Sequence, residues 1–186
     1  MLKLISKLYV QLAGWKAVGR KPEVKKCVMI AAPHTSNWDF PITMAILNVL
    51  DARFRFLGKK ELFRFPLGII MRFFGGMPVD RTKKGKMVDS MIEKLQQSEE
   101  LLLMIPVEGT RGYVKEWKSG FYHAALGAGV PIALGFLDYA KKEGGIMEEL
   151  FYPSGNYEED LKKIKTIYKE ITARHPELSS LKDFQA

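Results

Sequence analysis

The sequence from residue 27 to residue 40 reads Cys27-Val28-Met29-Ile30-Ala31-Ala32-Pro33-His34-Thr35-Ser36-Asn37-Trp38-Asp39-Phe40. Its first six residues form an apolar run that predicts a buried strand, and the apolar, helically spaced segment 41–50 predicts a helix after it. His34 therefore lies in a strand-to-helix connection, and Asp39 lies in or near the first helical turn. Because open α/β sheets carry their sites in such connections, residues 33–40 are the first candidate for chemistry.

His34 and Asp39 are spaced so that they can act together. One helical turn holds about 3.6 residues, so the Asp39 carboxylate can lie beneath a His34 ring that folds back from the loop. A carboxylate on one imidazole nitrogen fixes the tautomer and leaves the other nitrogen free as a base. The alternative is structural, because Ser36 followed by Asp39 resembles a helix capping box in which Asp39 binds backbone amides.

The composition narrows the class of protein and of partner. The chain has 186 residues, enough for one α/β domain with its own core. Its net charge of +8 favours an anionic partner, such as an anionic membrane surface, a phosphorylated substrate or nucleic acid. The single cysteine, Cys27, cannot form an internal disulfide, and the sequence has no Cys/His zinc spacing, so we expect no metal site.

Alternating short elements continue along the chain without repeats, linkers or low-complexity segments. Apolar runs predict strands, and three- and four-residue spacing predicts helices. The strands are expected at 53–57, 101–106 and 129–138, and the helices at 87–97, 121–128 and 157–174. The pattern predicts a single α/β domain whose mostly parallel or mixed central sheet is flanked by helices.

The N-terminal residues predict an amphipathic helix that runs to about Gly19. Its apolar residues recur at three- and four-residue intervals, at Met1, Leu4, Ile5, Leu8, Leu12 and Trp15. The segment is too interrupted to span a bilayer, which needs about 20 apolar residues, and it lacks the features of a signal peptide. The apolar stripe either packs on the body of the domain or contacts a membrane surface.

A second apolar segment extends from Leu62 to Phe74 and is punctuated by Arg64 and Arg72. The glycine pair at 75–76 ends it. The segment either belongs to the core or forms an exposed interface with acyl chains.

Two polar turns follow apolar runs and present arginines. Residues 77–81 end in Asp80-Arg81, and the run 101–106 leads to Glu108-Gly109-Thr110-Arg111. A guanidinium matches the oxygen geometry of a phosphate, and a glycine lets a ligand approach the backbone closely. Internal pairs, Asp80 with Arg81 and Glu108 with Arg111, are the structural alternatives.

The four motifs, taken in order, resemble those of the glycerolipid acyltransferase family, which includes the lysophosphatidate (1-acylglycerol-3-phosphate) acyltransferases. The motifs are H-T-S-N-W-D at 34–39, G-G-M-P-V-D-R at 75–81, E-G-T-R at 108–111 and V-P-I-A at 130–133. The likeness extends from about Cys27 to Phe136, which is most of the chain.

The resemblance implies a role for each motif. His34 and Asp39 match the catalytic pair of the HX4D motif. The residues implied in binding the acceptor phosphate are Arg81, Glu108, Gly109, Thr110 and Arg111. The residues of the last motif, implied in acyl-donor binding or in structure, are Val130, Pro131 and Ile132.

The implied activity is a step of phospholipid biosynthesis. A fatty acyl group moves from acyl-CoA or acyl carrier protein to a hydroxyl of a glycerophosphate-type acceptor such as lysophosphatidate, with His34 as the base and no cofactor. Residues 1–21 would then be an amphipathic helix with possible membrane contact, and residues 22–186 the acyltransferase domain. We expect peripheral binding at the cytoplasmic face of an anionic membrane, without a spanning helix.

Two other classes of function use the same residues. A thioester hydrolase could employ the same His–Asp pair without an acceptor. A non-catalytic module could use the basic surface to bind phosphate or nucleic acid, although no RNA- or DNA-binding motif is present.

Overall fold

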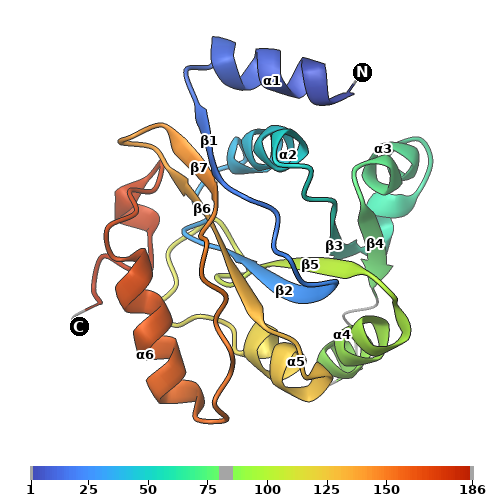
Figure 1. The fold of residues 1–186 in the computed structure, drawn as a ribbon, viewed down its shortest axis with the longest axis vertical. Helices are drawn as coiled ribbons and strands as arrows, with labels where there is room; N and C mark the ends of the chain where they lie inside the picture. Colours follow the sequence, from blue (N-terminus) through green and yellow to red (C-terminus); the bar gives the residue numbers. More distant parts are fainter. Residues whose placement is uncertain (1, 80–85, 185–186) are drawn as a thin grey trace.

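The computed structural model describes residues 2–79 and 86–184, which form a seven-stranded sheet between two layers of helices (Figure 1). The strands are β1 (Lys16–Gly19), β2 (Lys26–Ala31), β3 (Phe54–Lys59), β4 (Gly76–Val79), β5 (Leu101–Pro106), β6 (Ile132–Asp138) and β7 (Glu143–Ile146). The helices are α1 (Leu2–Leu12), α2 (Asp39–Val49), α3 (Leu67–Phe73), α4 (Lys86–Gln97), α5 (Gly120–Ala128) and α6 (Tyr157–Tyr168). Two 3-10 turns, η1 (Lys60–Phe63) and η2 (Pro176–Leu178), complete the elements of the described ranges.

The sheet is mixed, as the sequence predicts. Its order is β1-β7-β6-β2-β5-β3-β4. Five neighbouring strands are parallel to one another, namely β6, β2, β5, β3 and β4. Strand β7 is antiparallel to β6, and β1 pairs with β7 in parallel. The five parallel strands bring their carboxyl ends to one edge, where the loops of an open α/β sheet hold its sites.

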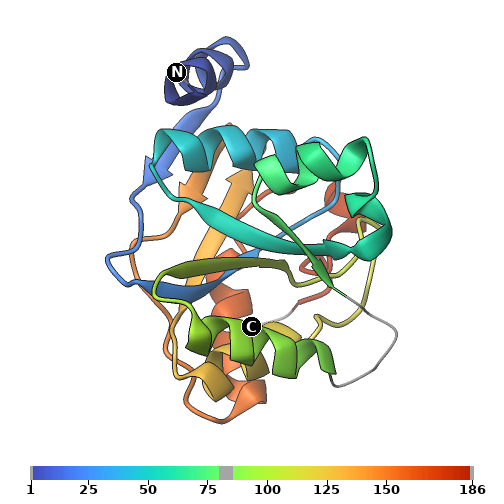
Figure 2. The ribbon, with the colours of Figure 1, turned by 90° about the vertical axis from the view of Figure 1, so that its right-hand side faces the viewer.

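The central strand β2 is buried on both faces because its side chains alternate between two cores. Val28 and Ile30 pack in the core that α4, α5 and α6 cover, and Cys27 and Met29 pack in the core on the α2 side. Figure 2 shows these helical layers on opposite sides of the sheet. A continuous apolar run is what a parallel strand covered on both faces requires.

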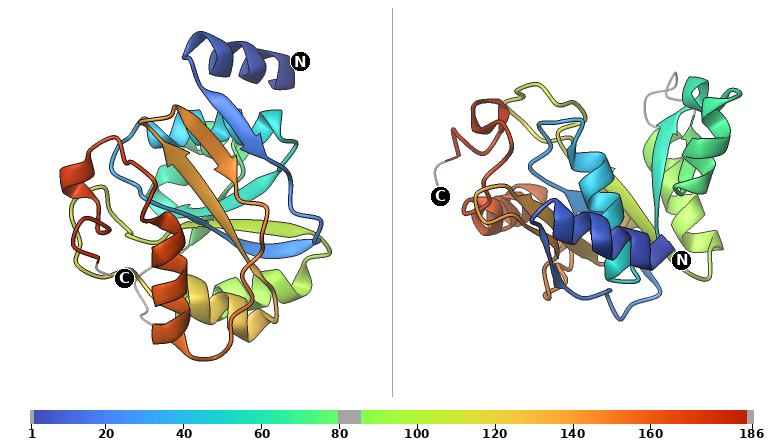
Figure 3. Two further views of the ribbon diagram at one scale, coloured as in Figure 1. Left: turned by 60° about the vertical axis from the view of Figure 1, so that its left-hand side comes forward. Right: turned by 90° about the horizontal axis from the view of Figure 1, so that it is seen from above.

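Helix α1 lies outside α2 (Figure 3), and most of its apolar stripe is exposed to solvent. Its buried residues are Ser6 and Val10, and Val10 packs against residues of α2. The stripe is exposed at Leu4 (72%), Ile5 (58%), Leu8 (57%) and Leu12 (80%). These four residues therefore do not pack on the body of the domain, whereas Trp15, beyond the end of α1, is buried in it. None of the described helices is long and apolar enough to cross a membrane.

Two predicted helices are shorter than the sequence pattern indicates. Helix α1 ends at Leu12 rather than near Gly19, because residues 16–19 form β1 and pair with β7. Helix α6 ends at Tyr168 rather than at residue 174, and the chain turns so that the Thr172 carbonyl accepts a hydrogen bond from the Tyr139 amide. In both cases the backbone forms hydrogen bonds with a segment distant in sequence instead of continuing the helix.

Candidate active site

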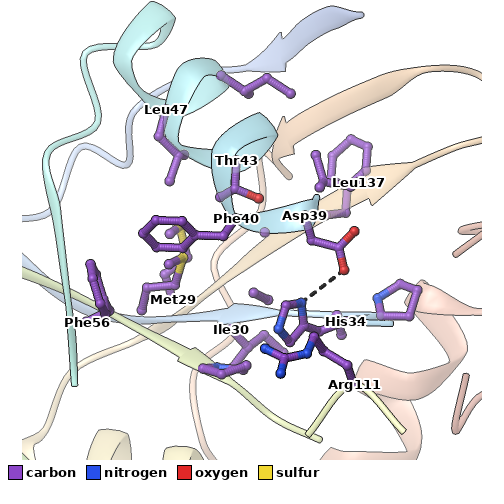
Figure 4. Close-up of a pocket in the computed structure, with 18 of the residues that line it drawn as sticks. Met29, Ile30, His34, Asp39, Phe40, Thr43, Leu47, Phe56, Arg111 and Leu137 are labelled. Carbon is purple, nitrogen blue, oxygen red and sulfur yellow. Dashed lines mark hydrogen bonds and ion pairs between the residues drawn. The ribbon is translucent and has the colours of Figure 1, made fainter. Parts of the chain in front are cut away.

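His34 and Asp39 are in contact at the carboxyl edge of the sheet (Figure 4). Strand β2 ends at Ala31 and α2 begins at Asp39, so the connection between them is short and holds both residues. The Nδ1 atom of His34 lies 3.0 Å from Oδ2 of Asp39. With a proton on Nδ1, the other ring nitrogen, Nε2, is the one with a free lone pair.

The same Asp39 oxygen also holds the loop that carries His34. Its Oδ2 accepts hydrogen bonds from the backbone amides of Thr35 (3.0 Å) and Ser36 (2.9 Å). These bonds do not form the expected capping box, because Trp38 is the N-cap residue of α2 and the Ser36 hydroxyl accepts the Trp38 amide instead. The catalytic and the structural interpretations of Asp39 are therefore compatible, because one carboxylate orients both the loop and the His34 ring.

Tyr139 is a site residue that the sequence reasoning missed. Its hydroxyl donates to Oδ1 of Asp39 at 2.6 Å. Its ring packs edge-on against Trp15, with 4.9 Å between ring centroids, and the Arg174 guanidinium lies 5.8 Å from its centroid. A signal was available, because Tyr139 directly follows β6 and the carboxyl ends of parallel strands share one edge.

The hydrogen bonds around Asp39 decide its ionisation. Burial raises the pKa of the carboxyl, but hydrogen bonds from His34, Tyr139 and Ser36 act against burial and bring the pKa below its ordinary value. Burial, followed by the bond to Asp39, raises the pKa of Tyr139 above its ordinary value. Asp39 is thus a carboxylate near neutral pH, and Tyr139 remains a hydroxyl donor to it.

Glu108 holds the backbone of His34 from the other side. It is 1% exposed, and its Oε2 accepts the His34 backbone amide at 2.6 Å. Its Oε1 accepts the amide and the hydroxyl of Ser180, at 3.2 and 2.7 Å. Both oxygens are engaged within the protein, so Glu108 ties the loop after β2 to the C-terminal segment.

The remaining residues of the third motif form an exposed turn after β5. Arg111 lines the cavity described below and lies beside His34 (Figure 4). Gly109 has a φ of +68°, which favours glycine, and the Thr110 hydroxyl accepts the Gly112 amide at 3.3 Å. Arg81, the other predicted phosphate ligand, lies outside the described residues.

The structure does not bring the fourth motif to the site. Val130, Pro131 and Ile132 lie at the amino end of β6, where Ile132 is in register with Val28. Strand β2 continues for three residues beyond Val28, which is about 10 Å at roughly 3.3 Å per residue, before the loop that carries His34 begins. Val130 and Ile132 are core residues, and the Pro131 carbonyl accepts the Val28 amide at 3.0 Å. This placement favours the structural interpretation of the motif.

An apolar cavity of about 380 Å³ lies between α2 and the sheet. His34 and Arg111 stand at one end of it, and Met29, Leu47 and Phe56 lie toward the other (Figure 4). The side chains between these ends are also mostly apolar, from α2, α3 and the strands. The cavity thus offers a long apolar compartment that starts at the His–Asp pair.

The polar groups at the mouth of this cavity bond chiefly to one another and to the backbone. Across residues 2–79 and 86–184, no group of three or more His, Cys, Asp or Glu side chains is placed to hold a metal ion. What the site provides is an imidazole paired with a carboxylate, an apolar compartment and a guanidinium.

Comparison with known proteins gives a family for this arrangement. A family model described as Acyltransferase matches residues 17–133, a range that includes His34, Asp39 and Arg111 and ends before Tyr139. The 1-acyl-sn-glycerol-3-phosphate acyltransferase of Haemophilus influenzae is 30% identical over 131 residues, covering 65% of this chain and 53% of that protein. The chain thus spans about half the length of this curated relative.

A solved structure has a similar fold. It is the crystal structure of the 1-acyl-sn-glycerophosphate (LPA) acyltransferase PlsC from Thermotoga maritima. The match has a TM-score of 0.60 and 18% sequence identity, and it covers 93% of this chain and 79% of that chain.

Proposed function

Because the chain belongs to the acyltransferase family, we propose that it moves a fatty acyl group from acyl-CoA or acyl carrier protein to a hydroxyl of a glycerophosphate-type acceptor such as lysophosphatidate. One observation carries this proposal, namely that the His34–Asp39 pair stands at one end of an apolar cavity and beside Arg111. Each part matches one part of the substrates. The base faces the hydroxyl, the cavity takes the acyl chain and the cation takes the phosphate.

His34 acts as a general base in this proposal. Its Nε2 removes the proton from the acceptor hydroxyl as the oxygen attacks the thioester carbonyl. The new carbon–oxygen bond forms, the carbon–sulfur bond breaks, and the imidazolium returns the proton to the departing thiolate. Asp39, held ionised by its hydrogen bonds, stabilises the imidazolium while it exists.

Two residues position the pair without touching the substrates. Tyr139 holds one Asp39 oxygen, so that the other oxygen stays aimed at the His34 ring and its loop. Glu108 fixes the His34 backbone amide. We therefore assign Glu108 to positioning His34 rather than to contacting the phosphate.

The cavity supplies the binding energy for the acyl chain. Each methylene that leaves water for an apolar environment contributes about 0.8 kcal/mol. With the thioester carbonyl at His34, the chain would run beneath α2 toward Met29 and Leu47. This energy orients the carbonyl for attack.

Arg111 is the phosphate ligand among the described residues. Its guanidinium lies at the end of the cavity where the acceptor must enter, and its planar fork suits two phosphate oxygens. Gly109 and Thr110 shape the turn that carries it. Arg81 remains the predicted second ligand.

The substrates are lipids, and α1 is the element we propose to meet the membrane. Leu4, Leu8 and Leu12 point into solvent, and the same helix carries Lys3 and Lys7. Each basic residue near an anionic leaflet contributes about 1 kcal/mol of attraction. We propose peripheral binding at the cytoplasmic face, with α1 lying in the interface.

A thiol-release assay tests the activity. The purified chain is incubated with a long-chain acyl-CoA, with and without lysophosphatidate, and free thiol and diacylated product are measured. Thiol release that requires the acceptor supports the transferase. Release without acceptor would make the protein a thioester hydrolase, and no release with either acyl-CoA or acyl carrier protein would favour a binding module.

A further inference from the structure

The segment from Leu62 to Phe73 exposes an unusual amount of apolar surface. Its members, which we call the α3 surface, are Leu62, Phe65, Leu67, Ile69, Ile70 and Phe73. Phe65 is 86% exposed, Phe73 69%, Ile69 66% and Ile70 52%. Isolated apolar side chains on a surface are ordinary, but six within twelve residues form a patch that marks a binding surface.

The packing on the inner side of α3 keeps the side chains of this patch exposed to solvent. Gly68 packs so closely on η1 that a Cβ there would collide with the Phe63 carbonyl. The Arg72 guanidinium lies 5.5 Å from the centroid of the buried Phe63 ring and donates to the Phe63 and Gly68 carbonyls at 3.4 Å. Met71 faces the cavity. The inner side of α3 is therefore already used, and its outer side chains cannot turn inward.

The charges around the patch indicate which partner fits. Lys59, Lys60 and Arg64 are exposed beside it, with Glu61 as the acidic residue of the same segment. An apolar patch rimmed by basic residues fits an anionic lipid surface, into which the apolar side chains insert while the cations meet the headgroups. The net charge of +8 acts in the same direction at longer range.

The position of α3 relates the patch to the cavity. Helices α1, α2 and α3 lie on the same side of the sheet (Figures 1 and 2), and Met71 and Phe74 pack in the core on that side. One wall of α3 thus faces the cavity through Met71, while the opposite wall carries Ile69 and Phe73.

We propose that the α3 surface is a lipid-docking site that inserts into an anionic phospholipid leaflet independently of α1. It places the wall of the acyl cavity against the bilayer, so that an acyl chain passes from lipid to cavity along α3. This route rests on the proposed acyltransferase function, but the docking itself does not.

A fluorophore at position 69 reports insertion directly. Cys27 is fully buried, and burial raises its pKa to about 12, so a thiol reagent labels an introduced cysteine selectively. Ile69→Cys carries an environment-sensitive dye, and Ile167→Cys, on α6 at the other face of the sheet, is the control. Vesicles with phosphatidylglycerol should shift the emission at 69 to the blue and leave 167 unchanged. No shift at 69, or equal shifts at both positions, would overturn the proposal.

A second measurement uses the full chain with polar substitutions. Ile69→Ser combined with Phe73→Ser should weaken sedimentation with phosphatidylglycerol vesicles by about tenfold or more, because two large side chains no longer enter the lipid. Ile167→Ser, with 44% exposure in the parent residue, is the matched control. Equal sedimentation of the double variant and the wild type would refute docking through α3.

Two further readouts separate other causes. Sedimentation velocity without lipid tests whether a second copy covers the patch, and a wild-type dimer that the double variant abolishes would overturn lipid docking. Acyl transfer between a short-chain donor and a water-soluble acceptor should be unchanged in the double variant. If the wild type shows no transfer at all, the proposed function fails while the vesicle result still decides the docking.

Discussion

The Tyr139 hydroxyl lies 2.6 Å from Oδ1 of Asp39, although 100 positions separate the two residues in sequence. The other Asp39 oxygen meets the His34 ring. One carboxylate thus links Tyr139, at the end of β6, to the His34 imidazole after β2, and the Tyr139 hydroxyl helps to hold that carboxylate in place. This relationship has consequences for stability and for catalysis.

Replacing Tyr139 with Phe keeps the ring against Trp15 and removes the hydroxyl. A hydrogen bond to a charged group contributes about 1.5–3 kcal/mol, so Tyr139→Phe should lower the free energy of unfolding by an amount in that range at pH 7. Acyl transfer should fall through kcat rather than KM, since Tyr139 does not line the cavity. Denaturant unfolding and steady-state kinetics measure both effects.

The stability difference should depend on pH with a defined sign. Because hydrogen bonds lower the pKa of Asp39 in the folded state, its contribution is fully present above the unfolded pKa of about 3.9 and is lost as the pH falls through the folded pKa. Wild type and Tyr139→Phe should therefore differ most near neutral pH and converge in acid. An equal difference at pH 7 and at about pH 3 would contradict this account of Asp39.

His34→Ala should abolish most turnover while leaving the fold intact. Removal of a general base costs about 10²–10⁴-fold in rate, and a half-buried loop side chain contributes little to the core. The measurement is kcat for acyl transfer, with thermal unfolding as the control for folding. Asp39→Asn should also lose activity. It replaces one of the two acceptor oxygens with an NH2 donor and so also weakens the bonds that hold the loop, which is why its melting temperature must be compared first.

Arg111→Lys preserves the charge and removes the planar fork. We expect a higher KM for a phosphorylated acceptor and little change for an acceptor that lacks the phosphate. Kinetics with a matched pair of acceptors measures this. Equal losses with both acceptors would mean that Arg111 shapes the loop after β5 rather than binding phosphate.

Thr43→Phe should narrow the cavity beneath α2. Thr43 is partly exposed and lines the cavity, so a larger side chain there displaces acyl carbons rather than core residues. If two methylenes lose their burial, long-chain donors lose about 1.6 kcal/mol, or roughly fifteenfold in kcat/KM. An acetyl donor serves as the control, and its rate should not change. Unaltered chain-length preference would place the acyl chain elsewhere.

Leu4→Ser combined with Leu8→Ser tests α1 as a membrane contact. The full chain should sediment with anionic vesicles, less so at high salt, and the double variant should sediment several-fold less, because only the α3 surface then inserts into the lipid. Leu126→Ser, on α5 at the other face of the sheet, is a control of the same residue type. If the α1 variant and this control bind alike, the helix is not an anchor.

Much of the fold follows from local sequence. The apolar runs at 27–32 and 101–106 correspond to β2 and β5, because a strand buried on both faces must be apolar throughout. The His34–Asp39 contact was predictable for a similar reason, since five positions across a strand–helix junction leave few alternatives for the two side chains.

Residues 16–19 show where local pattern is insufficient. Their spacing continues that of α1, yet they form β1 because the edge of β7 offers backbone hydrogen bonds. For the apolar stripe of α1, the sequence identified the feature correctly but not its surroundings. Helical periodicity identifies the stripe, but only the packing of Val10 on α2 shows that the stripe faces solvent.

The sequence by itself determined the class of fold, the buried strands and the pairing of His34 with Asp39, because each depends on residues within one or two turns of chain. The tertiary structure alone decided that Glu108, 74 positions from His34, binds its amide, and that Tyr139 binds Asp39. It also decided that the α3 surface is exposed rather than core. These outcomes depend on strand order, which sets which chain ends meet and which helix faces remain uncovered, and no local periodicity encodes that order.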